Sequence, residues 1–214
     1  MALAPFHLAD LRKSGLSDET ISQARIESVR PCDINREIGF DIPGLVSCYM
    51  IPFPPDFQYC RYKLFYAPGQ EHYSNGKRKP KYIQRKGAPN RLYIPPVLWE
   101  TGILQDSEQA FYITEGEKKA LKATQEGIPT LAICGLWNWK QPGSRIDELI
   151  PDFDLVEWKG RVVYVVPDND WLQAGKDGKA KNLKQAVYRL CWRLGERGAN
   201  TLIVQLPGGA SHGK

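Results

Sequence analysis

The chain has 214 residues, 42% of them hydrophobic and 25% charged, and a net charge of +5. This composition is typical of a soluble globular protein with one or two domains, and the charge is too small by itself to establish a nucleic-acid partner. The sequence has no run of about 18 apolar residues, and its five scattered cysteines form no C-x-x-C pair. We therefore expect a cytoplasmic protein without a membrane partner, a disulfide framework or a structural zinc site.

Residues 1–30 are predicted to form a helical hairpin. The segment 7–14 has helical character and stops at Gly15, and Ser17 can cap a second helix that begins with two acidic residues. Such a hairpin is a common accessory or docking element.

Residues 31–107 are predicted to form a small β-rich subdomain, because short β-like runs alternate there with proline and glycine. The expected strands cover residues 45–53, 59–66, 81–83 and 91–94. The glycine-containing segment 68–80 is expected to be a mobile loop.

Residues 108–214 alternate between strand and helix patterns. The expected order is strand 110–114, helix 117–125, strand 130–134, helix 145–150, strand 161–166, helix 182–196 and strand 201–206. Apolar strands separated by helices imply a parallel sheet with helices on both sides, so we predict an α/β fold for this part.

Acidic residues follow two of the predicted strands. Glu115 comes directly after the first strand, and Asp168 and Asp170 come after the third. In parallel sheets ligands bind beyond the carboxyl ends of the strands, and carboxylate oxygens are the ligands that Mg²⁺ prefers. Asp-Asn-Asp is also good turn chemistry, so a purely structural role is the alternative.

A run of basic residues within the β-rich part indicates a contact surface for nucleic acid. The expected residues are Lys77, Arg78, Lys79, Lys81, Tyr82, Arg85, Lys86 and Arg91, and Tyr93 follows. Seven positive charges with no acidic residue among them attract a polyanion, and tyrosine rings can stack on bases of a single strand. The alternative is a solvated surface loop.

Three segments carry a resemblance to a known family: 111–119 (FYITEGEKK), 133–135 (ICG) and 162–170 (VVYVVPDND). They resemble a Toprim domain, the fold shared by bacterial-type primases, type IA and type II topoisomerases and some nucleases. Together with segments 7–20 and 80–87, the chain more narrowly resembles the Toprim-like domain of uncharacterised function found in plasmid and phage replication proteins.

The resemblance implies roles for the residues at the strand ends. Glu115 is implied to bind metal or to act in general acid–base chemistry, and Asp168 with Asp170 to bind Mg²⁺, with Mn²⁺ as a possible substitute. Lys118 or Lys119 would neutralise phosphate charge.

The resemblance also concerns the extent of the domain. Toprim sheets commonly carry a further acidic group after the next strand, whereas this sequence stops at Lys214. We therefore expect the α/β domain 108–214 to be truncated at its C-terminus.

These features predict a Mg²⁺-dependent nucleic-acid enzyme, most simply a primase-like nucleotidyltransferase of plasmid or phage DNA replication. Its partners would be single-stranded DNA or a primer-template, nucleotides and a replicative helicase. Two alternatives stay open: a non-catalytic DNA-binding or helicase-docking module with the same fold, and a metal-dependent nuclease. The same acidic cluster serves bond making and bond breaking, so the sequence does not separate them.

Overall fold

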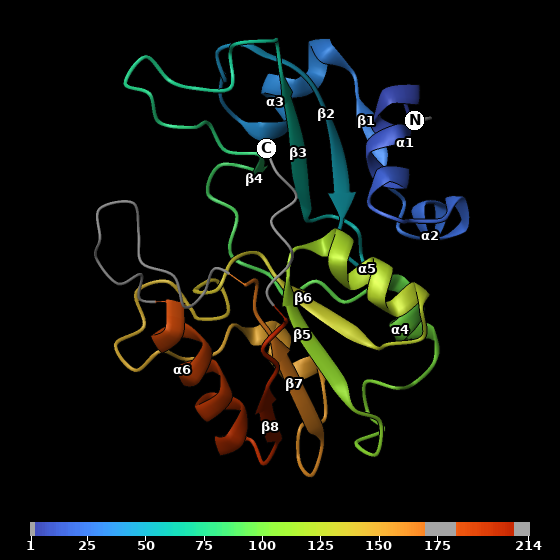
Figure 1. The fold of residues 1–214 in the computed structure, drawn as a ribbon, viewed down its shortest axis with the longest axis vertical. Coiled ribbons are helices and arrows are strands. Elements are labelled where there is room, and N and C mark those ends of the chain that lie inside the picture. Colours follow the sequence, from blue (N-terminus) through green and yellow to red (C-terminus); the bar gives the residue numbers. More distant parts are fainter. Residues whose placement is uncertain (1–2, 170–182, 208–214) are drawn as a thin grey trace. The chain divides into compact units, whose positions relative to one another are not determined.

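The structure, a computed structural model, describes residues 3–169 and 183–207 (Figure 1). The chain divides into two compact units, Met1–Pro89 and Asn90–Lys214. Residues 90–107, predicted to belong to the β-rich subdomain, lie in the second unit. Among the helices described, none has both the length and the apolar composition needed to cross a bilayer.

The first unit begins with the two short helices expected from the sequence, α1 (Pro5–Lys13) and α2 (Asp18–Gln23). The hydroxyl of Ser17 caps α2 by accepting a hydrogen bond from the backbone N–H of Thr20 at 3.1 Å. The chain then enters strand β1 (Glu27–Val29) instead of continuing as helix, because this segment pairs with the neighbouring strand of the sheet.

The sheet of the first unit is antiparallel, with the strand order β1-β2-β3-β4. After β1 come the 3-10 turn η1 (Pro31–Asp33), α3 (Ile34–Ile38), β2 (Leu45–Pro52), β3 (Cys60–Tyr66) and β4 (Tyr82–Gln84). Three of the predicted strands are confirmed within a residue or two at their ends. Cys48, Tyr62 and Leu64 pack on one side of the sheet against Ile34 and Ile38.

Helix α1 packs on the sheet through His7, which lies between aromatic side chains. Its ring centroid is 5.3 Å from that of Tyr49 and 4.8 Å from that of Phe65. His7 is 1% exposed, and its Nδ1 and Nε2 lie 2.7 Å and 3.3 Å from the hydroxyls of Ser28 and Ser47. The imidazole is therefore part of the core of this unit.

Burial lowers the pKa of His7 from its ordinary value of 6.5, while the charge of Asp10 raises it less. Below pH 6.5 the unfolded chain takes up a proton at this position that the folded chain does not. We therefore expect stability to fall as the pH drops from 6.5 toward the lowered pKa, by at most about 1.4 kcal/mol per pH unit.

Urea unfolding followed by far-UV circular dichroism at pH 7.5 and 5.5 measures this effect. The variant His7→Gln should lose part of the difference between the two pH values, whereas the exposed His72→Gln should keep it. An equal pH dependence in wild type and His7→Gln would contradict the assignment.

The second unit contains a parallel sheet with the strand order β6-β5-β7-β8. Its elements are α4 (Pro96–Glu100), β5 (Phe111–Glu115), α5 (Glu117–Gln125), β6 (Thr130–Ile133), the 3-10 helix η2 (Pro151–Leu155), β7 (Val162–Val166), α6 (Leu183–Glu196) and β8 (Asn200–Ile203). The buried side of α6, with Val187, Leu190 and Leu194, belongs to the same core as the strands. The expected α/β fold with a parallel sheet flanked by helices is confirmed.

Two predicted elements of this unit are wrong. Residues 91–94 form no strand; flanked by prolines, they pair with β6 only through a bridge between Tyr93 and Ala132. Residues 145–150 form no helix, because Asp147 has a φ of 54° and Leu149 forms a bridge with Lys140. A left-handed residue interrupts the helical hydrogen-bond pattern.

A buried arginine ties the loops of the second unit to its sheet. Arg161 is 0% exposed, and its guanidinium lies 4.3 Å from the ring centroid of Phe111. It donates hydrogen bonds of 2.6 to 3.1 Å to the carbonyl oxygens of Ile103, Leu104, Gln109 and Glu157. This side chain therefore satisfies carbonyl groups that the loops bring into the interior.

Candidate active site

Two of the predicted carboxylates leave neighbouring strands at the same edge of the parallel sheet. Glu115 is the last residue of β5, and Asp168 is the second residue after β7. The strands are hydrogen-bonded partners, with Thr114 paired to Val166. The third carboxylate, Asp170, lies outside the described residues.

The chain turns sharply after Glu115 because Gly116 has a φ of +88°, a conformation that glycine adopts at low cost. The N–H of Gly116 donates to the carbonyl of Ile133 at 3.0 Å, which holds the turn against the end of β6. Helix α5 starts one residue later, so Lys118 and Lys119 fall in its first turn, next to the strand edge.

Lys119 forms an ion pair with Asp168 across the strand edge, its ammonium meeting the carboxylate oxygen Oδ1. Both side chains are about half exposed, so the pair lies at the surface of the site. Lys118 is half-buried. The structure therefore gathers Glu115, Lys119 and Asp168, three predicted residues from two separate segments of the chain, at one edge of the sheet.

A buried glutamate beneath this edge was not predicted. Glu117 is 2% exposed, and the thiol of Cys134 donates to its Oε1 at 3.5 Å. Burial raises the pKa of the Tyr93 hydroxyl, and the charge of Glu117 raises it further. In the sequence Glu117 resembled an ordinary residue of a first helical turn, and nothing there indicated that Cys134 and Tyr93 would enclose it.

The donor set of this edge fits a hard divalent cation. Mg²⁺ commonly binds through one or two carboxylates and keeps several waters, and Glu115 with Asp168 supplies two carboxylates. Within residues 3–169 and 183–207, no three possible ligands come together. Asp170, two positions after Asp168 in the sequence and outside the described residues, is the candidate for a third carboxylate.

The predicted basic surface is largely exposed in the first unit. The exposed members are Lys77, Arg78, Lys81, Arg85 and Lys86. None of the five forms an ion pair with another residue in the part of the chain that the structure describes. Their charges are therefore available to a polyanion.

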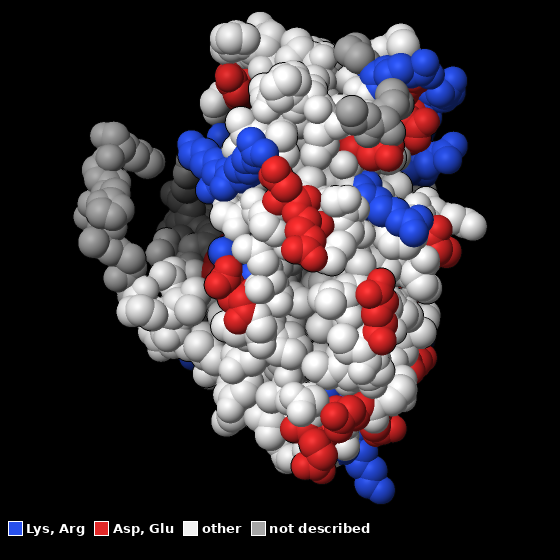
Figure 2. Space-filling model, turned by 90° about the vertical axis from the view of Figure 1, so that its right-hand side faces the viewer, with Lys and Arg blue, Asp and Glu red and all other residues white. Residues whose placement is uncertain are grey.

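Positive charge does not extend evenly over the molecule. On the face drawn in Figure 2, most lysine and arginine side chains lie in the upper half among aspartate and glutamate side chains, and acidic side chains predominate in the lower half. The net charge of +5 therefore gives no basic field over that face, and the exposed run in the first unit is the better candidate for a polyanion.

Lys79, also predicted for this surface, is used inside the fold. It is 5% exposed, and its ammonium donates to the carbonyl oxygen of Pro43 at 2.7 Å. A nucleic acid would have to break this hydrogen bond to reach the charge. The structure therefore gives Lys79 an anchoring role.

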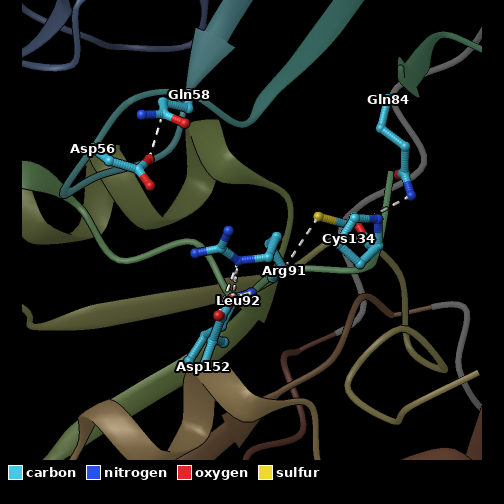
Figure 3. Close-up of polar contacts among 8 residues, drawn as sticks. Asp56, Gln58, Gln84, Arg91, Leu92, Cys134 and Asp152 are labelled. Atoms are coloured by element: carbon cyan, nitrogen blue, oxygen red, sulfur yellow. Dashed lines mark hydrogen bonds and ion pairs between the residues drawn. The ribbon is translucent and has the colours of Figure 1, made fainter. Parts of the chain in front are cut away.

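Arg91 is engaged in the same way in the second unit (Figure 3). Its Nε donates to both carboxylate oxygens of Asp152, at 2.7 and 2.9 Å, and the N–H of Leu92 donates to the same carboxylate at 2.7 Å. Asp152 is buried, so the pair holds this segment on η2. The charge of Arg91 is therefore paired with Asp152 inside the fold.

The predicted aromatic residues also differ in their surroundings. Tyr82 is half-buried, with the cationic groups of Lys63 and Arg61 at 5.0 and 5.6 Å from its ring centroid. Tyr93 is fully buried in the second unit and is not available for stacking on a base. The two cations from β3 were not predicted, although their alternation along one strand was a visible signal.

Solved structures of a primase and of DnaG have a similar fold. The Aquifex aeolicus primase structure comprising the zinc-binding and RNA polymerase domains matches with a TM-score of 0.59 and 14% identity, over 97% of this chain and 51% of that one. A structure of the DnaG catalytic core matches with a TM-score of 0.57 and 16% identity, over 98% of this chain and 67% of that one. The DnaG primase catalytic domain bound to single-stranded DNA gives 0.57 and 16%, over 98% and 68%.

The fold is thus that of a primase catalytic core, and the chain spans about half the length of the Aquifex aeolicus structure. The comparison with curated proteins found no match. The family model described as "Domain of unknown function (DUF3854)" matches residues 98–214, more than half of the chain. The chain therefore belongs to this family.

Proposed function

We propose that this chain is a Toprim-type, Mg²⁺-dependent domain that carries out primase-like nucleotidyl transfer in plasmid or phage DNA replication. The observation that carries the proposal is the meeting of Glu115, Lys119 and Asp168 at the carboxyl edge of the parallel sheet. On this proposal the protein acts in the cytoplasm. Its partners are nucleotides, single-stranded DNA or a primer-template, and a replicative helicase.

The residues at the strand edge have different roles in phosphoryl transfer. When bound, Mg²⁺ supplies charge neutralisation at the reacting phosphate and activates the attacking hydroxyl. Asp168 and Asp170 hold the metal, and Glu115 binds beside them or accepts the proton of the hydroxyl. Lys118 and Lys119, in the first turn of α5, neutralise negative charge on the incoming phosphates.

The first unit holds the nucleic acid in this proposal. The five exposed cations of the basic surface bind phosphates of a single strand, and the ring of Tyr82 contacts a base. Binding of this kind depends strongly on salt, because each neutralised phosphate releases counterions.

A primer-synthesis assay tests the proposal. The protein is incubated with single-stranded DNA, labelled nucleoside triphosphates and Mg²⁺ or Mn²⁺, and we expect short labelled products that vanish with EDTA. DNA binding without any product would overturn nucleotidyl transfer. Metal-dependent degradation of the DNA without synthesis would identify a nuclease instead.

One observation favours a second candidate, a non-catalytic DNA-binding or helicase-docking module. The ion pair between Lys119 and Asp168 balances the charge of that carboxylate without a metal ion. Isothermal titration with Mn²⁺ separates the two candidates: heat of binding at the strand edge supports the enzyme, and its absence beside salt-sensitive binding of single-stranded DNA supports the module.

A further inference from the structure

The segment between β3 and β4, expected to be a loop, forms a small hairpin over residues 71–79. His72 and Arg78 are antiparallel bridge partners. The N–H of Lys79 donates to the carbonyl of Glu71, and the N–H of Tyr73 donates to that of Lys77, each at 2.8 Å. We call this segment the β3–β4 hairpin.

The tip of the β3–β4 hairpin has the geometry of a tight turn. The N–H of Gly76 donates to the carbonyl of Tyr73 at 2.9 Å, and Gly76 has a φ of +75°. The side chain of Asn75 accepts from the N–H of Lys77 at 3.1 Å. Glycine in the left-handed region after such a turn is a common hairpin closure, so the tip is ordered by its own hydrogen bonds.

The base of the hairpin is anchored to the first unit by Lys79. Besides its hydrogen bond to Pro43, the ammonium of Lys79 lies 5.4 Å from the ring centroid of Tyr66 and 5.8 Å from that of Tyr73. The hydroxyl of Tyr66 donates to the carbonyl of Pro80 at 2.8 Å. The hairpin is thus tied down at the side where it joins the sheet.

The tip presents an aromatic ring and two cations to solvent. Tyr73 is 45% exposed, although a large side chain of this kind is usually more buried. Lys77, whose carbonyl accepts from the N–H of Tyr73, and Arg78, the bridge partner of His72, are both exposed, and neither forms an ion pair with any other described residue. A ring next to uncompensated cations is the combination that binds single-stranded nucleic acid, by base stacking and phosphate contact.

We propose that the β3–β4 hairpin is a contact for single-stranded nucleic acid, in which a base stacks on Tyr73 while Lys77 and Arg78 bind the adjoining phosphates. The inference rests on the proposed function for the kind of ligand, but it concerns binding and needs no turnover. Because the β3–β4 hairpin is already ordered before it binds, it loses less conformational entropy when it contacts the nucleic acid.

Fluorescence anisotropy with a labelled oligothymidylate, in metal-free buffer, tests the proposal. Tyr73→Ala should weaken binding by about 5- to 150-fold, since one stacked base contributes about 1–3 kcal/mol, and Tyr73→Phe should bind like wild type. Tyr188→Ala, which removes an equally exposed tyrosine from α6, is the matched control. The double variant Lys77→Ala/Arg78→Ala should reduce the slope of log affinity against log salt by about 0.7 per charge.

The stacking itself has its own readout. An oligonucleotide with 2-aminopurine should lose fluorescence on binding to wild type and to Tyr73→Phe, but less on binding to Tyr73→Ala. If Tyr73→Ala binds like Tyr188→Ala, or if wild type does not bind the oligonucleotide, the hairpin proposal is overturned. Normal binding through Tyr73 without primer synthesis or metal binding would instead overturn the proposed function and leave the hairpin contact standing.

Discussion

The variant Asp168→Asn is expected to lose metal-dependent primer synthesis by about a hundredfold or more, while its fold stays intact. The amide keeps the shape of the side chain but removes the charge that attracts the cation, and about 3 kcal/mol of transition-state stabilisation corresponds to this loss. Incorporation of labelled nucleotides on single-stranded DNA in the presence of Mg²⁺ measures the rate, and circular dichroism checks the fold.

The matched control is Asp154→Asn. Asp154 is exposed, forms an ion pair with Arg197 at 2.6 Å and belongs to η2, not to a strand end. This variant should keep activity within about twofold of wild type, because an exposed ion pair contributes little to stability. Full activity of Asp168→Asn would remove this residue from the site.

The variant Arg161→Met is expected to destabilise the second unit by about 3–5 kcal/mol. Methionine fills a similar volume, but the buried carbonyl groups that the guanidinium satisfies lose their donor. Burial lowers the pKa of Arg161 because it removes the charge from water; the hydrogen bonds and the ring of Phe111 offset this cost. Urea unfolding followed by tryptophan fluorescence measures the change, because Trp139 and Trp158 are buried in this unit.

Arg197→Met is the control for this experiment, since Arg197 lies at the end of α6 in the same unit and its ion pair is partly exposed. Its loss should change the free energy of unfolding by about 1 kcal/mol or less. If Arg161→Met unfolded at the same urea concentration as Arg197→Met, the buried hydrogen bonds would have no net stabilising effect.

Local sequence patterns were sufficient to predict most of the parallel sheet. Segments 162–166 and 131–133 are continuous apolar runs. Helix α5 spans the predicted residues 117–125 because its apolar positions and the following Gly127 mark a helix and its end. The rule for parallel strands predicts that Glu115 and Asp168 lie at the same edge of the sheet, whereas the pairing of β5 with β7, which makes them neighbours, came only from the structure.

Nonlocal partners limited the prediction elsewhere. Arg91 looked like a surface residue until the fold placed Asp152 beside it, 61 positions along the chain. Lys79 looked the same, yet its partner is the carbonyl of Pro43, a group that no pattern of side chains reveals. The predicted helix at 145–150 failed because Asp147 is held in a turn by ion pairs with Lys140 and Arg189.

The ion pair between Lys119 and Asp168 has a consequence for assembly of the site. A cluster of carboxylates usually resists folding until a metal ion arrives, but here an ammonium from α5 acts as an internal placeholder. We therefore expect the second unit to reach its fold without magnesium. In the proposed site, magnesium would therefore have to displace this ammonium from Asp168 in order to bind.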